Sequence, residues 1–135
     1  MNNICYRIHQ LFNSMKRCNC SCIKNEIPQN GIYILFEKGE LAHSTNRIVR
    51  VGTHTGENNL PSRLIEHFVK ENKDRSIFRK NIGRAILNKN NDPYLKIWDK
   101  DLTSKKAKDN DFHLVDFEKQ KKIEKMVSQY IKENI

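Results

Sequence analysis

The sequence predicts a small α+β domain in which an antiparallel pair of strands is flanked by helices. Two apolar, β-branched runs bounded by turn residues predict the strands, at residues 31–36 and 47–52. Apolar residues at intervals of three and four predict helices on both sides of this pair. The length of 135 residues fits one fold of this kind.

Residues 1–27 are predicted to form an N-terminal helix and a cysteine-rich loop. Apolar side chains recur at helical spacing over residues 3–16, which is typical of an amphipathic helix. These apolar residues are Ile4, Ile8, Leu11, Phe12 and Met15.

The cysteines leave two interpretations open. Cys18, Cys20 and Cys22 form a C-x-C-x-C run, and a zinc site completed by Cys5 or His9 is one of them. Free thiols in a cytosolic protein are the simpler one, because the usual C-x-x-C pair is absent.

The strand pair is predicted from Gly31–Phe36 and Arg47–Gly52. A connection of about ten residues is expected between them, with the reversal beginning at residues 37–40. Side chains alternate along a strand, so Tyr33 and Leu35 share one face while their neighbours occupy the other.

Helices are expected at residues 60–71, 76–88 and 117–131, with a helical turn at 94–98 and another helix from a Thr103 cap through Lys108. Arg63 and His67 stand four residues apart and should project side by side from the first of these helices. Ser76 is the expected N-cap of the second. The apolar residues expected on its buried side are Phe78, Ile82, Ala85 and Ile86, with Arg79, Lys80 and Arg84 on other faces.

Charge favours a polyanionic partner. The 25 Lys and Arg exceed the 16 Asp and Glu, for a net charge of +9, and the excess is concentrated between Arg63 and Lys89. Cationic side chains release counterions when they bind phosphates, so DNA contacts are predicted for Arg79, Lys80 and Arg84. No apolar run suggests a membrane span or a signal peptide, so the expected location is cytoplasmic and no membrane partner is expected.

One order of motifs stands out. Gly31-Ile32-Tyr33 opens the first strand, Arg50-Val51-Gly52 closes the second, a helix then carries Arg63, and a basic segment follows at residues 78–81. This arrangement resembles the GIY-YIG nuclease family over residues 28–87. The second signature is degenerate, because Arg50 stands where the family has a tyrosine. On this resemblance, residues 28–135 are expected to form the nuclease domain.

The resemblance implies a DNA endonuclease that hydrolyses phosphodiester bonds with a divalent metal such as Mg²⁺ and without a small-molecule cofactor. Hydrolysis needs a deprotonated water, and cations around the phosphorus as its negative charge grows. The implied roles are water activation for Tyr33 and a bidentate phosphate contact for Arg63. His67 would bind the phosphate or move a proton. Arg50 and His54 are further catalytic candidates.

The metal ligand is the main departure from the family, whose members use a glutamate on a helix after a third strand. Residues 112–115 are the only candidate strand, which would make Glu118 or Glu124 the ligand, although a solvated lysine-rich helix explains both more simply. The favoured alternative places the third strand beyond Tyr130–Asn134, so that the domain would be truncated and inactive. A non-catalytic DNA-binding module and a small α+β interaction domain also remain open.

Overall fold

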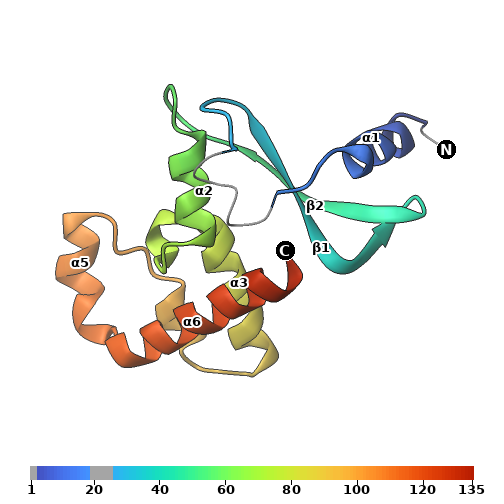
Figure 1. Ribbon diagram of the computed structural model, residues 1–135. Helices are drawn as coiled ribbons and strands as arrows, with labels where there is room; N and C mark the ends of the chain where they lie inside the picture. The colour runs from blue at the N-terminus through green and yellow to red at the C-terminus, as the bar shows by residue number, and fades with distance from the viewer. Residues whose placement is uncertain (1–2, 19–25) are drawn as a thin grey trace. The chain divides into compact units, whose positions relative to one another are not determined.

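The structure, a computed structural model, describes residues 3–18 and 26–135 (Figure 1). The chain forms two compact units, one made of Met1–Ile65 with Lys132–Ile135 and the other of Glu66–Ile131. In chain order the elements are α1 (Asn3–Ser14), β1 (Ile32–Ala42), β2 (Thr45–Thr53), α2 (Leu60–Phe68), η2 (Lys73–Arg75), α3 (Ile77–Lys89), α4 (Leu95–Trp98), α5 (Lys105–Asp111), η3 (Phe112–Leu114) and α6 (Phe117–Asn134). The predicted α+β class, with a small antiparallel sheet and flanking helices, is confirmed.

The sheet of the first unit is an antiparallel hairpin. β1 and β2 are joined by a tight turn in which His43 and Ser44 have φ values of 52° and 60°. Two successive positive φ angles match the twist of the flanking strands. The predicted ten-residue connection is therefore wrong, because the polar residues after Phe36 continue the strand. The predicted alternation is confirmed, since Tyr33 and Leu35 are each only 8% exposed.

Two helices join this hairpin within the first unit. α1 lies against β2, where the Asn13 side-chain amide donates to the Asn46 carbonyl at 2.9 Å. α2 begins beside the start of β1, because the Leu60 N–H donates to the Gln29 carbonyl at 3.0 Å. Leu60 and Leu64 are buried and stand four residues apart, so they form the apolar side of α2.

The second unit is helical. Ser76 caps α3 as predicted, since its hydroxyl accepts from the Arg79 N–H at 3.2 Å. Trp98 is fully buried and its indole N–H donates to the Lys80 carbonyl at 2.9 Å. Gly83 lets this indole approach α3, because an added Cβ would overlap the ring. The other buried apolar residues of the unit are Phe78, Leu87, Tyr94, Leu102, Val115, Ile123, Val127 and Ile131.

The predicted buried side of α3 is partly wrong. Phe78 is buried as expected, but Arg79 and Lys80 are buried too, whereas Ala85 is exposed. A charged side chain can be buried when its hydrogen-bonding groups find partners, and the rest of the second unit supplies them for Arg79.

Residues 112–115 do not form the candidate third strand. Phe112–Leu114 is the 3₁₀ helix η3, in which the Val115 N–H donates to the Phe112 carbonyl at 3.2 Å. The described residues therefore contain one sheet of two strands. α5 is capped by Ser104 and not by the expected Thr103.

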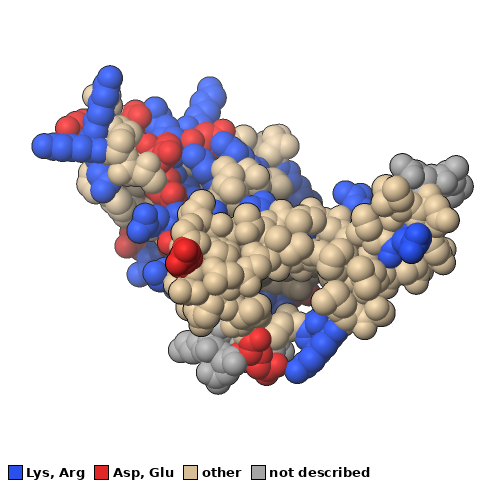
Figure 2. All heavy atoms as spheres, turned by 90° about the horizontal axis from the view of Figure 1, so that it is seen from above, with Lys and Arg blue, Asp and Glu red and all other residues tan. Residues whose placement is uncertain are grey.

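Charged side chains of both signs are interspersed over the helices of the second unit (Figure 2). None of the described helices combines the length and the apolar character that crossing a bilayer requires.

Candidate active site

Tyr33 and Arg50 meet on one face of the hairpin. Tyr33 pairs with Gly52 and Leu35 pairs with Arg50 across the strands, so these four side-chain positions share a face. The Tyr33 ring lies over Gly52, where an added Cβ would overlap both the ring and its hydroxyl. This brings the phenol to Arg50, whose Nε donates to the Tyr33 hydroxyl oxygen at 3.3 Å. The glycine of the second signature thus makes room for the tyrosine of the first.

His54 closes the end of the hairpin. Its Nε2 accepts from the Gly31 N–H at 3.2 Å, so Nδ1 carries the proton in the neutral ring. Nδ1 is buried and has no hydrogen-bond partner among the described residues. An unsatisfied buried donor costs about 1–3 kcal/mol, which makes His54 a candidate for contact with an anionic ligand.

The segment before β1 is held to the loop that leads into α2. The Asn58 N–H donates to the Asn30 side-chain oxygen at 2.8 Å, and the Asn30 amide donates to the Asn58 side-chain oxygen at 2.9 Å. Arg63 lies half-buried on α2 within the same unit as Tyr33, Arg50 and His54. The first unit therefore contains four of the five predicted catalytic residues.

The Tyr33 ring also forms part of the wall of a pocket of about 410 Å³ in the first unit. Its described lining is mostly apolar and includes Phe12, Phe36, Leu60 and Leu64. The ring is therefore held by packing on one side while its hydroxyl contacts Arg50, which fixes the direction of the phenol.

His67, the fifth predicted catalytic residue, is part of the core of the second unit. It is 0% exposed, its Nδ1 lies 2.6 Å from the Ser76 hydroxyl, and its ring contacts Phe68 and Phe78. Apolar contacts and the Ser76 hydrogen bond enclose His67, and its role in phosphate binding or proton transfer stays a prediction.

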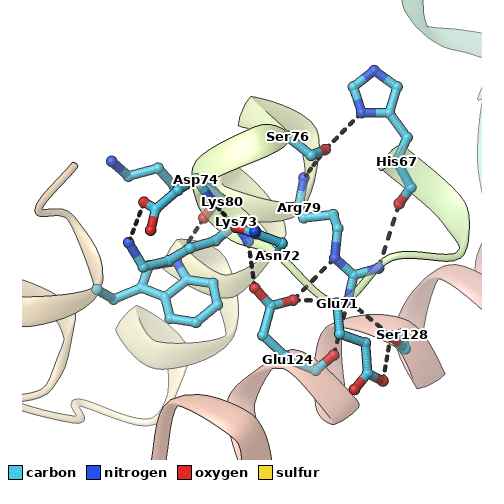
Figure 3. Close-up of polar contacts among 11 residues, drawn as sticks. His67, Glu71, Asn72, Lys73, Asp74, Ser76, Arg79, Lys80, Glu124 and Ser128 are labelled. Carbon is cyan, nitrogen blue, oxygen red and sulfur yellow. Dashed lines mark hydrogen bonds and ion pairs between the residues drawn. The ribbon is translucent and has the colours of Figure 1, made fainter. Parts of the chain in front are cut away.

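Arg79 and Glu124 form a buried ion pair in the second unit (Figure 3). Arg79 is 0% exposed, and its Nε and Nη2 donate to Glu124 Oε2 at 3.0 and 2.8 Å. Nη2 also donates to the Glu124 carbonyl at 3.0 Å and to the Ser128 hydroxyl at 2.8 Å, and Nη1 donates to the His67 carbonyl at 3.4 Å. With all its donors directed inward, Arg79 does not present the DNA contact that the sequence predicts.

Glu124 does not fit the role of metal ligand in this structure. Oε2 accepts from Arg79, and Oε1 accepts from the Lys73 backbone N–H at 2.5 Å. Burial raises the pKa of this carboxyl, while the hydrogen bonds from Arg79 and Lys73 oppose the rise. The solvated helix face expected for Glu124 is also wrong, since the residue is buried. The described residues hold no group of three His, Cys, Asp or Glu side chains suited to a metal ion.

Lys80 and Arg84 differ from Arg79 in their surroundings. Arg84 is half-exposed and its Nε donates to Asp99 at 2.5 Å. Lys80 is largely buried, and its pKa is lowered by burial and then by the charges of Lys73 and Arg84. Of the three expected DNA contacts, Arg84 is therefore the one that is partly exposed, whereas Lys80 is buried like Arg79.

The cysteine run falls partly outside the described residues. Cys20 and Cys22 lie in the undescribed segment, while Cys5 and Cys18 are exposed. The zinc interpretation therefore stays a prediction.

The fold and the strand-borne tyrosine define a small α+β domain with a phenol–guanidinium pair at a hairpin. The chain belongs to the GIY-YIG domain family, whose model matches residues 3–135. The match includes α1, which lies outside the segment that carries the resemblance in the sequence. Searches of curated proteins and of solved structures returned no match.

Proposed function

We propose that this chain is a DNA endonuclease-type domain whose reacting groups lie in the first unit. The observation that carries the proposal is the Tyr33–Arg50 contact beside Gly52. Tyr33 is the tyrosine of the first family signature, and Arg50 stands where the second signature has its tyrosine. Membership of the GIY-YIG family supports a nuclease-type activity.

In the proposed reaction Tyr33 acts as its phenolate, which orients the attacking water and takes up one of its protons as the water oxygen bonds to phosphorus and the bond from phosphorus to the leaving oxygen breaks. Arg50 donates to the phenol oxygen at 3.3 Å, which holds the ring in one orientation and stabilises negative charge near that oxygen. Arg63 is proposed to bind the scissile phosphate, since a guanidinium is always charged and can form two parallel hydrogen bonds. The Nδ1–H of His54 is proposed as a further donor to the same phosphate.

A divalent cation is proposed as the metal of the reaction, in keeping with the family. When bound, it would act as a Lewis acid on the phosphate oxygens. Because the Glu124 oxygens are engaged by Arg79 and Lys73, Glu124 is not proposed as its ligand, and no step is assigned through the metal.

A second candidate function is DNA binding without cleavage. The specific observation that favours it is the commitment of Glu124 to a buried ion pair, since this carboxylate was the predicted ligand. The partly exposed Arg84 would serve DNA binding in either case.

A metal-dependent cleavage assay separates the two functions. Plasmid DNA is incubated with the chain in Mg²⁺ or in EDTA, and nicked and linear products are measured. Tyr33→Phe and Arg63→Ala should each lower the rate by a factor of about 10² or more, as is usual for loss of a proton-transfer group or a charge-stabilising donor.

Matched controls are Tyr6→Phe and Arg75→Ala, which change exposed residues that are not among the proposed site residues. They should cleave like the wild type. Cleavage that survives in Tyr33→Phe would exclude the proposed role of the phenol. DNA binding without any cleavage in Mg²⁺ or Mn²⁺ would support the second function.

A further inference from the structure

The N-terminal helix is attached to its unit by its polar side. His9 Nε2 accepts from the Ile48 N–H at 3.4 Å, and the Asn13 amide donates to the Asn46 carbonyl at 2.9 Å. His9 also contacts the His43 ring at a centroid distance of 4.8 Å. His9 and Asn13 are four residues apart, so they lie on one face of α1 and direct it toward β2.

The apolar stripe of α1 faces away from that attachment. Ile4, Ile8 and Leu11 follow the helical period, and their positions fall opposite His9 and Asn13 around the axis. The exposed fractions of these three side chains are 61%, 42% and 57%, and no residue of α1 is buried. An amphipathic helix that folds for its own core would place this stripe inward. Within the described residues this stripe stays exposed, so we infer that its binding partner lies outside them.

Charge indicates what that occupant is. Residues 1–25 contain Arg7, Lys16, Arg17 and Lys24 and no Asp or Glu. Arg7 is exposed and borders the stripe, with which it lines a shallow surface depression. On the face drawn in Figure 2, the surface over α1 at the right is tan with Lys and Arg atoms and shows no Asp or Glu atoms. Lys16 and Arg17 follow the helix directly, although Lys16 also pairs with Glu26 and Arg17 stacks on Phe36.

From this geometry we propose that α1 is an interfacial anchor that docks this domain on an anionic lipid surface. The stripe enters the boundary between headgroups and acyl chains, and Arg7, with Lys16 and Arg17, contacts the lipid phosphates and carboxylates. The polar side keeps its hydrogen bonds to β2, so the hairpin is held at the membrane. This inference goes beyond the proposed cleavage, because it uses no residue of the proposed active site. It differs from the sequence-based expectation that there is no membrane partner, which stays a prediction.

The test is co-sedimentation of the whole chain with vesicles of phosphatidylcholine alone or mixed with phosphatidylserine. Wild-type protein should pellet with the mixed vesicles far more than with the neutral ones. The double variant Ile8→Gln with Leu11→Gln should lose at least about tenfold in affinity, because two apolar side chains no longer leave water. Arg7→Gln should lose about fivefold.

The matched control is the double variant Ile77→Gln with Met126→Gln, which removes two comparably exposed apolar side chains, at 47% and 46%, from the second unit. It should bind vesicles like the wild type. Neither double variant alters the charge of the chain. A loss of vesicle binding in the α1 variant alone would therefore show that the stripe docks, because attraction of the basic chain to any polyanion would be the same in both variants. The α1 variant should keep the wild-type melting temperature and DNA affinity.

Three results would overturn the proposal. Equal vesicle binding by the α1 variant and the wild type would show that the stripe is not used. Failure of the wild type to pellet with the mixed vesicles would exclude lipid as the occupant. A wild-type dimer that the α1 variant dissociates, without vesicle binding, would assign the stripe to a second copy of the chain. Absence of DNA cleavage would count against the proposed function alone.

Discussion

At the scale of single residues, the proposed site depends on one position without a side chain. Gly52 lies opposite Tyr33 in the hairpin, and the phenol occupies the space that any other residue would fill. The contact from Arg50 to the Tyr33 hydroxyl depends on that space. The requirement at position 52 is therefore for an absent Cβ and not for an unusual backbone angle.

Gly52→Ala should displace the Tyr33 ring and lower DNA cleavage by a factor of about 10², the usual cost of misplacing a reacting group by about 1 Å. The overlap should also reduce the free energy of unfolding by about 1–3 kcal/mol. Cleavage rates and urea unfolding of the variant measure the two effects. Val51→Ala, at an exposed neighbouring position, is the control, and full activity of Gly52→Ala would contradict the placement of Tyr33.

Also at the residue scale, the Arg79–Glu124 pair shows why a basic residue in a basic segment is not automatically a DNA contact. Removing one partner of a buried ion pair leaves the other without compensation, which typically costs about 3–5 kcal/mol. The pair also occupies the carboxylate that was the predicted metal ligand. Its place in this chain is thus structural, between α3 and α6.

At the scale of elements, a loop carboxylate connects α4 and α6 in the second unit. Asp92 accepts from the Tyr94 N–H at 2.9 Å at the start of α4 and from Lys119 of α6 at 2.8 Å. The hydrogen bond from Lys119 and then that from Tyr94 lower the pKa of Asp92 below 3.8. A lowered carboxyl pKa means that the folded state is stabilised by the ionised form.

The stability contributed by Asp92 should be present above pH 3.8 and lost as the pH falls through its folded-state pKa. Asp92→Asn should therefore melt at a lower temperature than the wild type at pH 7. This difference in melting temperature, the gap between the two proteins, should narrow at pH 3 and below. Thermal unfolding followed by circular dichroism measures the gap. Asp109→Asn, at an exposed carboxyl on α5, should show no such change, and a gap for Asp92→Asn that is constant with pH would contradict the role of its charge.

At the scale of the whole molecule, a net charge of +9 determines how the chain should meet DNA. Some of the positively charged side chains are exposed, whereas others, such as Arg79, are buried and paired within the protein. The number of cations that DNA can reach is therefore smaller than the sequence count suggests.

Affinity for duplex DNA should fall steeply with salt, because each phosphate contact releases counterions. Replacing Arg84 by Gln should reduce the slope of log affinity against log salt by about one. Fluorescence anisotropy over a series of salt concentrations measures it. Ile77→Gln is an uncharged control on the same helix and should leave the slope unchanged. Retention on DNA that ignores salt would instead support a small α+β interaction domain whose charge is incidental.

Local patterns in the sequence determined the α+β class, the order of the elements, the Ser76 cap and the shared face of Tyr33 and Leu35. Each of these depends on residues only a few positions apart, since helical period, strand alternation and capping act at short range. The Gly31-Ile32-Tyr33 signature on the first strand could likewise be recognised from the sequence alone. These features were predicted because the physics that fixes them is local.

Tertiary structure alone decided which charged and polar groups are buried. Arg79 and Glu124 are 45 residues apart in sequence, and nothing near either one indicates the other as its partner. The same holds for the burial of His67 against Ser76 and for the turn of the hairpin at His43 and Ser44. The outward direction of the α1 stripe also depends on the hydrogen bonds of His9 and Asn13 to β2, which are distant in sequence. Periodicity identifies an apolar face, but only long-range contacts decide whether that face turns inward, because partners distant in sequence compete for it.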